Sequence, residues 1–411
     1  MANRQCMIFS QDNTFHLVWL DKKNVEGPPD EVRAFVVVRN ECTRLPFLIS
    51  YYRNLGVERF FVVDDHSDDG TREYALQQAD IHVFSPSSTY KESDFGNDWL
   101  NLLLDTFGTE HWTLVVDADE LLIYPHSEIV KLPEFCWYLD QDACTALFVF
   151  LLDMYPDEDL SKAVCVPNKP FYEICPFFDS DYVFRRQRQS LSNGTECMLS
   201  EEVIGGPRLR KFYPWQRRTD LLSKLAIKLV NNIARKAAFW RGDKPHYAPA
   251  LFKVPLIKWH KGCKRLSGHI VAKTSQGKIA EVTGVFLHFK FFADFHKKAL
   301  SEALRKQHYG GGQEYRRYLS VIKKQPNISF MYAGSRRYID SDSVLKAGLM
   351  RTTPAFEELV QSINLSSGTY CRAARMVAAT SSGVSTWSEA TSITPTMTSL
   401  PVNKAISEGG T

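Results

Sequence analysis

Acidic side chains follow three short apolar runs in the first third of the chain. Each run is apolar throughout, as expected of a strand buried on both faces. Clustered carboxylates resist joint ionisation unless a positive charge is present, and a divalent cation is the usual solution. Oxygen ligands suit Mg²⁺ or Mn²⁺, with phosphates completing the coordination shell. The acidic groups are Glu41, Asp64, Asp65, Asp117 and Asp119.

The elements that must position these groups alternate between strand and helix patterns. Apolar, mostly β-branched or aromatic runs predict strands at 32–38, 59–63, 81–84 and 112–116. Apolar residues at helical spacing predict helices at 44–55, 71–79 and 99–107. This alternation predicts βαβ units and a mostly parallel α/β sheet flanked by helices. Because parallel strands bind ligands at their carboxyl ends, we expect the acidic groups to meet at one edge.

Each acidic group also has a simpler interpretation. Asp117 and Asp119 form a DxD pair directly after an apolar run, so a metal site is favoured over a solvated turn. Asp64 and Asp65 precede Gly70 and Thr71, where a turn into a helix is expected. There a carboxylate can accept from a base N–H or a ribose hydroxyl, or the cluster can serve as a capping loop.

Length and composition bound the remaining possibilities. The chain has 411 residues, a net charge of +3 and 24% charged residues, which is ordinary globular usage and disfavours a nucleic-acid binder. Nine cysteines without a CxxC pair favour reduced thiols in a cytoplasmic protein. Residues 1–30 show no secretory signal pattern.

Composition also suggests how the chain is divided. We expect an N-terminal extension at 1–30, an α/β unit at 31–152, a mixed region at 153–325 and a helical or irregular segment at 326–361. Within the mixed region, 291–306 is expected to be helical and to end before the glycines at 310–312. Residues 362–411 are rich in Ser and Thr, and we expect them to form a disordered or loosely attached tail.

The combined motifs resemble a family-2-like glycosyltransferase of the GT-A fold, in the soluble bacterial glycosyltransferase 2-like group. The resemblance covers residues 31–308 and includes VVRNE at 37–41, FFVVDDHSDDGT at 60–71 and WTLVVDADE at 112–120. It continues through GGPR at 205–208, KVPL at 253–256 and LHFK at 287–290. His66 departs from the family, which often has Gly or Asn at that place.

The resemblance implies specific roles. Asp65, with Asp64 and Glu41, would hold the nucleotide, and Asp117 would face the ribose or the metal. Asp119 and His288 would bind Mn²⁺ or Mg²⁺. The groups expected to neutralise the diphosphate are Arg208, Arg210 and Lys290.

The implied reaction is inverting glycosyl transfer by a single displacement. A carboxylate would deprotonate the acceptor hydroxyl. We assign this role to Asp153 because it follows the apolar run at 145–152 and so lies near the same edge. Asp179, Asp181 and Glu202 remain competitors for the base.

A basic amphipathic stretch interrupts the mixed region. Residues 205–244 contain eleven Lys or Arg and two Asp, and apolar residues share one helical face within 215–241. The apolar face either packs on the protein or contacts the inner face of an anionic membrane, which would suit a lipid-linked acceptor.

The leading expectation is therefore a nucleotide-sugar-dependent transferase that builds a polysaccharide of the cell envelope. One alternative is a sugar-phosphate nucleotidyltransferase, which the absence of Gly at 39–43 disfavours. Another is a non-catalytic nucleotide-sugar-binding or membrane adaptor that keeps the fold.

Overall fold

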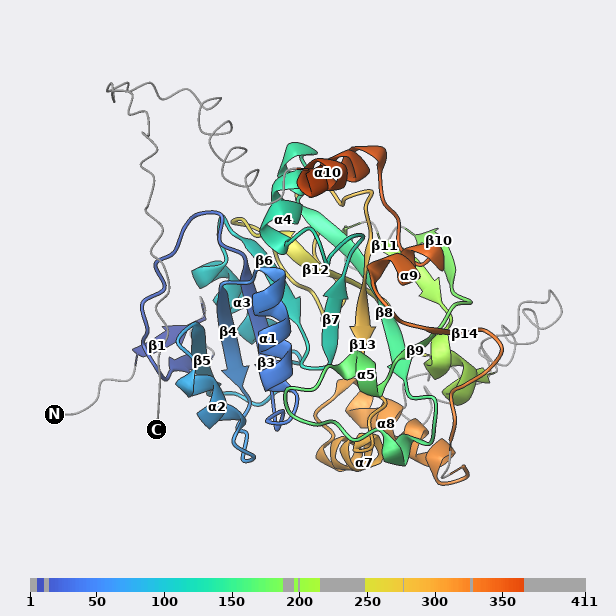
Figure 1. Ribbon diagram of the computed structural model, residues 1–411. Helices are drawn as coiled ribbons and strands as arrows, with labels where there is room; N and C mark the ends of the chain where they lie inside the picture. Colours follow the sequence, from blue (N-terminus) through green and yellow to red (C-terminus); the bar gives the residue numbers. More distant parts are fainter. Residues whose placement is uncertain are drawn as a thin grey trace, which may run out of the picture. The chain divides into compact units, whose positions relative to one another are not determined.

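One large mixed sheet, flanked by helices, runs through the protein (Figure 1). The computed structural model describes residues 6–10, 15–187, 196–198, 200–214, 248–275, 277–325 and 328–365. These residues belong to one compact unit, Met1–Leu365. The predicted α/β class is confirmed, although antiparallel strands are interleaved with the parallel ones.

The first half of the chain follows the predicted alternation, and the predicted elements are confirmed to within two residues at their ends. Gly56 ends the first helix in the left-handed conformation, with φ 102°. The elements are β1 (Cys6–Phe9), β2 (His16–Trp19), β3 (Arg33–Val38), α1 (Leu45–Leu55), β4 (Arg59–Asp64), α2 (Thr71–Gln77), β5 (Ile81–Pro86), α3 (Asn97–Phe107), β6 (Trp112–Val116), β7 (Glu120–Ile123) and α4 (Leu132–Gln141).

The second half adds strands to the same sheet, so the boundary expected after residue 152 falls inside a strand, β8. The glycines at 310–312 do not end a helix but lie near the start of α8. The elements are β8 (Ala146–Tyr155), η1 (Leu160–Lys162), α5 (Phe171–Ile174), β9 (Phe177–Asp179), β10 (Val183–Gln187), β11 (Ser200–Ile204), η2 (Arg208–Phe212), β12 (Phe252–Lys258), β13 (Gly284–His288), α7 (Phe295–Arg305), α8 (Tyr309–Ile322), β14 (Ser335–Arg337), α9 (Ser341–Lys346) and α10 (Pro354–Leu365).

The strand order creates a switch point in the sheet. The main path reads β1-β2-β5-β4-β3-β6-β12-β8-β13-β7. The chain moves outward from β3 through β4 to β5 and then returns to the other side of β3 as β6, and all these pairs are parallel. In open α/β sheets a ligand binds outside the carboxyl ends of the strands at such a point. The acidic segments after β3 and β6 lie there.

Alternate residues of the central strands pack on opposite faces, which explains their continuous apolar sequence. One face of the sheet packs against α1 and α4, whose core residues include Leu48, Tyr52 and Phe135. The other face packs against α3, through Trp99 and Leu103. In Figure 1 the arrowheads of β4 and β13 point toward the end of the sheet where α7 and α8 lie.

Two predicted regions fall largely outside the described residues. The basic stretch at 215–241 is among them, so its interpretation stays a prediction. The first four residues of the expected tail, 362–365, belong to α10, and the remainder lies outside the described part. No helix among the described residues is long and apolar enough to cross a lipid bilayer.

The paired glycines of the GGPR stretch make room for an aromatic ring. Gly206 has φ 81°, and a Cβ built on it would lie 2.6 Å from the Tyr182 hydroxyl oxygen. That hydroxyl is buried without a hydrogen-bond partner in the described part of the protein. Any larger residue at 206 would therefore meet both backbone strain and a steric clash. The glycines lead directly into η2, which carries Arg208 toward the sheet.

We expect Gly206→Ala to lower the free energy of unfolding by about 2–4 kcal/mol, since it adds overpacking to left-handed strain. Gly262→Ala is the matched control, because Gly262 has φ 97° but open space around its Cβ position. It should cost only about 1 kcal/mol. Adding Tyr182→Phe to Gly206→Ala removes the closest atom and should restore part of the loss. Chemical denaturation measures all three, and equal effects at 206 and 262 would contradict this account.

Candidate functional site

Three side chains line up at the carboxyl ends of β8 and β13. His288 lies opposite Asp153 in the parallel pairing of these strands. Its Nδ1 is 2.6 Å from Asp153 Oδ1, and its Nε2 is 3.6 Å from Asp119 Oδ2. The latter gap is too wide for a hydrogen bond. A backbone bond of 2.8 Å from Phe289 N to Asp119 O fixes the two segments together.

Asp153 is fully buried and occupied at both oxygens. Its relative exposure is 0%, and Oδ2 accepts from Arg208 Nε at 2.7 Å. Burial opposes ionisation, but Arg208 and His288 lower the pKa of Asp153 below its ordinary value. A base must reach the acceptor hydroxyl. The geometry therefore disfavours the predicted role of Asp153 as base. It indicates instead that Asp153 holds the His288 ring in position.

Lys253 joins two carboxylates beside this line. Its Nζ lies 2.7 Å from Asp117 Oδ2 and 2.5 Å from Glu120 Oε1. The Asp117 side chain is 61% exposed, whereas that of Glu120 is 1% exposed. Desolvation and the charge of Asp117 raise the pKa of Glu120 to about 8. Burial also opposes ionisation of Asp117, but the charge of Lys253 and its hydrogen bond outweigh this effect and lower the pKa of Asp117 below its ordinary value.

This arrangement predicts a pH-dependent contribution to stability. The pKa of Glu120 is raised from an ordinary 4.5 to about 8. As pH rises through that window the unfolded chain releases the proton and the folded protein retains it, so stability falls. Glu120→Gln cannot ionise, and we expect it to gain thermal stability relative to the wild type between pH 5 and pH 8.5. Glu281→Gln at the surface is the control. If the melting temperatures of Glu120→Gln and the wild type changed with pH in the same way, Glu120 would be ionised in the folded protein throughout this pH range, which would contradict the prediction.

Two further cations lie close to the line of side chains. Lys290 Nζ is 3.4 Å from Glu314 Oε1 and 5.1 Å from the centre of the Tyr315 ring. Arg208 is 3% exposed, and its Nη2 has no hydrogen-bond partner among the described residues. A buried guanidinium nitrogen without a partner is costly. An anionic ligand could accept a hydrogen bond from this nitrogen.

Arg210 does not join this group. It makes two hydrogen bonds to Asp179, of 3.1 and 2.9 Å, and lies 4.1 Å from the centre of the Tyr332 ring. Its predicted role at the diphosphate is not supported by this pairing. Asp179 is 1% exposed and Asp181 accepts from Tyr332, so neither is a free base. The remaining competitor, Glu202, lies in the β10–β11 hairpin.

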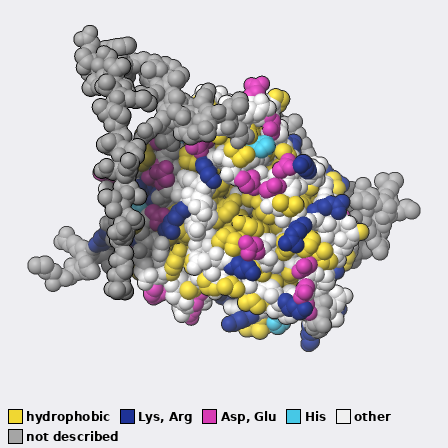
Figure 2. Space-filling view, in the orientation of Figure 1, with side chains coloured by type: hydrophobic (Ala, Val, Ile, Leu, Met, Phe, Trp, Pro, Cys, Tyr) yellow, Lys and Arg dark blue, Asp and Glu magenta, His cyan; other side chains and the backbone are white. Residues whose placement is uncertain are grey.

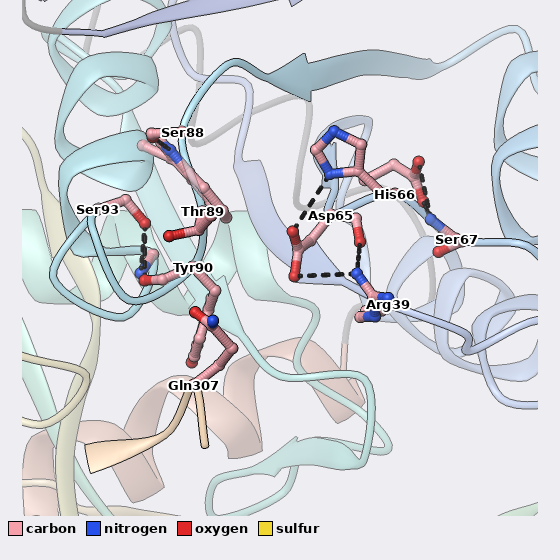
Figure 3. A network of polar contacts seen from close by, with 12 residues as sticks. Arg39, Asp65, His66, Ser67, Ser88, Thr89, Tyr90, Ser93 and Gln307 are labelled. Atoms are coloured by element: carbon pink, nitrogen blue, oxygen red, sulfur yellow. Dashed lines mark hydrogen bonds and ion pairs between the residues drawn. The ribbon is translucent and has the colours of Figure 1, made fainter. Parts of the chain in front are cut away.

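The carboxylates after β4 are paired with arginines. Asp64 is buried and lies 2.6 Å from Arg72 Nη2. Asp65 accepts from Arg305 of α7, and Arg39 Nη1 donates to its backbone oxygen at 2.8 Å (Figure 3). His66 has φ 57°, which explains why Gly or Asn suits this turn.

Two basic side chains of helix α7 pair with the acidic residues at the ends of β3 and β4. Near its start, Lys298 Nζ lies 2.6 Å from Glu41 Oε1, and at its end Arg305 pairs with Asp65. Arg44 bonds Glu41 at 3.2 Å and Asp294 at 2.7 Å, and against the effect of burial these two carboxylates, with a smaller contribution from Asp119, raise the pKa of Arg44. The predicted nucleotide residues Glu41 and Asp65 are therefore both paired with basic side chains of α7.

A loop after β5 closes the other side of this network. Gln307 Oε1 accepts from Lys91 N at 3.1 Å, and the Tyr90 ring lies 6.0 Å from the Arg305 guanidinium carbon. Burial first and then the charge of Asp117 raise the pKa of Tyr90. Figure 3 shows Tyr90 and Gln307 next to each other, across the view from the group formed by Asp65, His66 and Arg39. Tyr90 therefore lies beside Arg305, the residue that pairs with Asp65.

Several of these residues have no role that could be predicted from the sequence. Lys253 carries a visible signal, since it is a charge inside the apolar strand at 252–258. Tyr90, Arg305 and Glu314 carry none, because they reach the site from segments far apart in the sequence. The resemblance included the stretch at 253–256 but assigned it no function.

The described part of the site offers two side chains, Asp119 and His288, that are close enough together to share a metal ion. Within the described residues, no group of three or more His, Cys, Asp or Glu side chains is placed to hold a metal ion. Asp119 and His288 Nε2 are nevertheless 3.6 Å apart. Two ligands about 2.1 Å from one Mg²⁺ are roughly 3 to 4 Å apart, depending on the angle between them. The pair fits an ion whose other ligands are phosphate and water.

A cavity of about 550 Å³ lies at the other end of β8, away from this site. It is lined by Phe148, Glu201, Ile279, Ala280, Glu281, Arg351, Thr352 and Thr353. It contains none of the predicted site residues.

Comparisons with known proteins do not identify the chain. No family model matches the sequence, and no curated protein matches it. The residues and their geometry therefore carry the functional argument alone.

Proposed function

We propose that the protein is a metal-dependent glycosyltransferase that moves a sugar from a nucleoside diphosphate donor to a glycan or lipid-linked acceptor. The observation that carries the proposal is the line Asp153–His288–Asp119 at the carboxyl ends of the strands. Asp153 Oδ1 lies 2.6 Å from His288 Nδ1 and so leaves Nε2 directed at Asp119. A histidine that binds a metal commonly donates its other N–H to a carboxylate in this way.

Asp119 and His288 would hold a Mg²⁺ or Mn²⁺ ion, and Asp117 lies beside them at the exposed end of β6. A divalent cation would polarise phosphate oxygens and stabilise the leaving diphosphate. The need for phosphate ligands follows from the small number of protein ligands. Donor and metal should therefore bind together.

The surrounding cations suit a polyanionic leaving group. Arg208 has a buried nitrogen without a partner in the described part, and Lys290 lies on the segment that follows His288. Both act electrostatically on the two aspartates beside His288. Arg208 lowers the pKa of Asp153, and Lys290 contributes to lowering the pKa of Asp119. In such a position they stabilise charge that develops on the departing diphosphate.

The nucleoside would bind at the ends of β3 and β4. Asp65 is 4% exposed and lies beside Arg39 and Arg305. Carboxylates there can accept from a ribose hydroxyl or a base N–H. Tyr90 offers an aromatic ring next to Arg305. Inversion by a single displacement needs one base, and the burial of Asp153 leaves that role to another group.

The direct test is a screen of nucleotide-sugar hydrolysis across UDP, GDP, dTDP and CMP donors, with Mn²⁺, with Mg²⁺ and with EDTA. We expect hydrolysis of one or more diphosphate donors that EDTA abolishes. Donor binding without any turnover, also on addition of glycan acceptors, would favour the adaptor alternative. Absence of binding by every donor would overturn the proposal.

A further inference from the structure

The outward face of α7 is unusual for a surface helix, because it carries two exposed leucines. Leu300 and Leu304 lie one turn apart and are 46% and 73% exposed. The inner face packs Phe295 and Ala299 against the protein, and both are buried. A helix on a protein surface normally presents polar residues outward. The two leucines therefore contribute neither to the core nor to the site behind the helix.

The charges on this outward face are all basic. The exposed positions of α7 and the residue after it are 296, 297, 300, 301, 304 and 306, and none of them is acidic. Lys297 and Lys306 lie among them, together with His296. In contrast, Lys298 and Arg305 turn inward to Glu41 and Asp65. Apolar residues rimmed by lysines are typical of helices that rest on a lipid surface.

A second segment brings more exposed apolar side chains near the start of α7. Ala293 N donates to Ala163 O at 2.8 Å, which holds the loop at 163–169 beside the start of α7. In this loop Val164 is 57% exposed and Val166 is 46% exposed. Acidic residues 157–159 precede the loop, and Lys162 pairs with Glu158 at 2.5 Å. Figure 2 shows hydrophobic, basic and histidine side chains together at the lower edge, where Figure 1 places α7.

We propose that the α7 surface, formed by Val164, Val166, Leu300 and Leu304 with Lys297 and Lys306, docks the protein on an anionic lipid bilayer. The aliphatic side chains would enter the interfacial region while the lysines contact acidic headgroups. The two lysines and the absence of acidic residues among the exposed positions of α7 favour lipid over a second copy of the chain. The inner face of the same helix reaches Glu41 and Asp65, so docking would hold the candidate site next to the membrane. This proposal does not depend on the transfer reaction.

The test is co-sedimentation of the full chain with vesicles of phosphatidylcholine, alone or mixed equally with phosphatidylglycerol. We expect the wild type to bind the mixed vesicles more tightly. Leu300→Gln/Leu304→Gln should weaken partitioning at least about tenfold, because two aliphatic side chains are lost from the interface. Lys297→Glu/Lys306→Glu should weaken binding to mixed vesicles about fivefold or more. Ile339→Gln is the matched control, since Ile339 is 76% exposed elsewhere on the surface and should change nothing.

Two results would overturn the proposal. One is equal vesicle binding by the wild type and Leu300→Gln/Leu304→Gln, which would leave membrane contact to another part of the chain or to none. The other is a wild-type dimer that becomes monomeric in this variant, since the leucines would then pair two copies. Light scattering without vesicles measures the second. Circular dichroism and thermal melting of each variant verify that it is folded.

Discussion

Asp119→Asn should reduce metal-dependent donor turnover by about a thousandfold, because removing a metal ligand forfeits several kcal/mol of charge stabilisation and each 1.4 kcal/mol is a factor of ten. The fold should survive this change. The Asp119 side chain is 28% exposed, and its contact with His288 is 3.6 Å long. We therefore expect the free energy of unfolding to change by less than about 1 kcal/mol.

The measurement is initial rate against Mn²⁺ concentration for the wild type, Asp119→Asn and a surface control, Asp342→Asn. Asp342 is 46% exposed and pairs with Lys346 on α9. Only Asp119→Asn should lose activity, and raising Mn²⁺ should recover part of it. An Asp119→Asn enzyme that keeps most of its turnover in the same metal range would remove Asp119 from the metal site.

Asp153→Asn should have the largest combined effect on stability and activity. Arg208 would lose its anionic partner at 2.7 Å in a buried position, and an unpaired buried charge costs about 3–5 kcal/mol. His288 would lose the carboxylate that fixes its ring, and loss of such a partner commonly lowers metal affinity 10–100-fold. We therefore expect a less stable protein whose apparent affinity for Mn²⁺ falls by one to two orders of magnitude.

A second variant separates these effects. In Asp153→Asn/Arg208→Gln the buried charge is also removed, so stability should partly recover while the affinity for Mn²⁺ stays low. If Asp153 instead deprotonates the acceptor, Asp153→Asn would keep its affinity for Mn²⁺ and lose the acidic limb of its pH–rate profile. That outcome would contradict the positioning role derived from its burial.

The parts of the fold that depend on local pattern were predictable from the sequence. Strands and helices between residues 32 and 116 follow apolar spacing, and the acidic groups fall at their ends because a buried strand cannot hold an unpaired charge. The insertion of β12 between β6 and β8 was not predictable. It pairs segments more than 100 residues apart in antiparallel fashion, and no local pattern specifies such a partner.

The basic residues of the candidate site show where spacing misleads. Arg208 and Arg210 are two residues apart in η2, and positions so spaced in a helical turn do not share a face. Arg208 therefore turns to Asp153, and Arg210 turns to Asp179. The sequence placed Asp153 near the correct edge but could not show that both its oxygens are engaged. That knowledge requires the positions of Arg208 and His288.

The central claim is that Asp119 and His288 hold a divalent cation together with a nucleoside diphosphate. Isothermal calorimetry of UDP and GDP, each titrated with and without Mn²⁺ into the wild type and Asp119→Asn, tests it most directly. The account predicts that one of these nucleotides binds the wild type tightly only when Mn²⁺ is present, and that Asp119→Asn loses this metal-dependent gain. Equal nucleotide affinity with and without Mn²⁺, or an unchanged gain in Asp119→Asn, would contradict it.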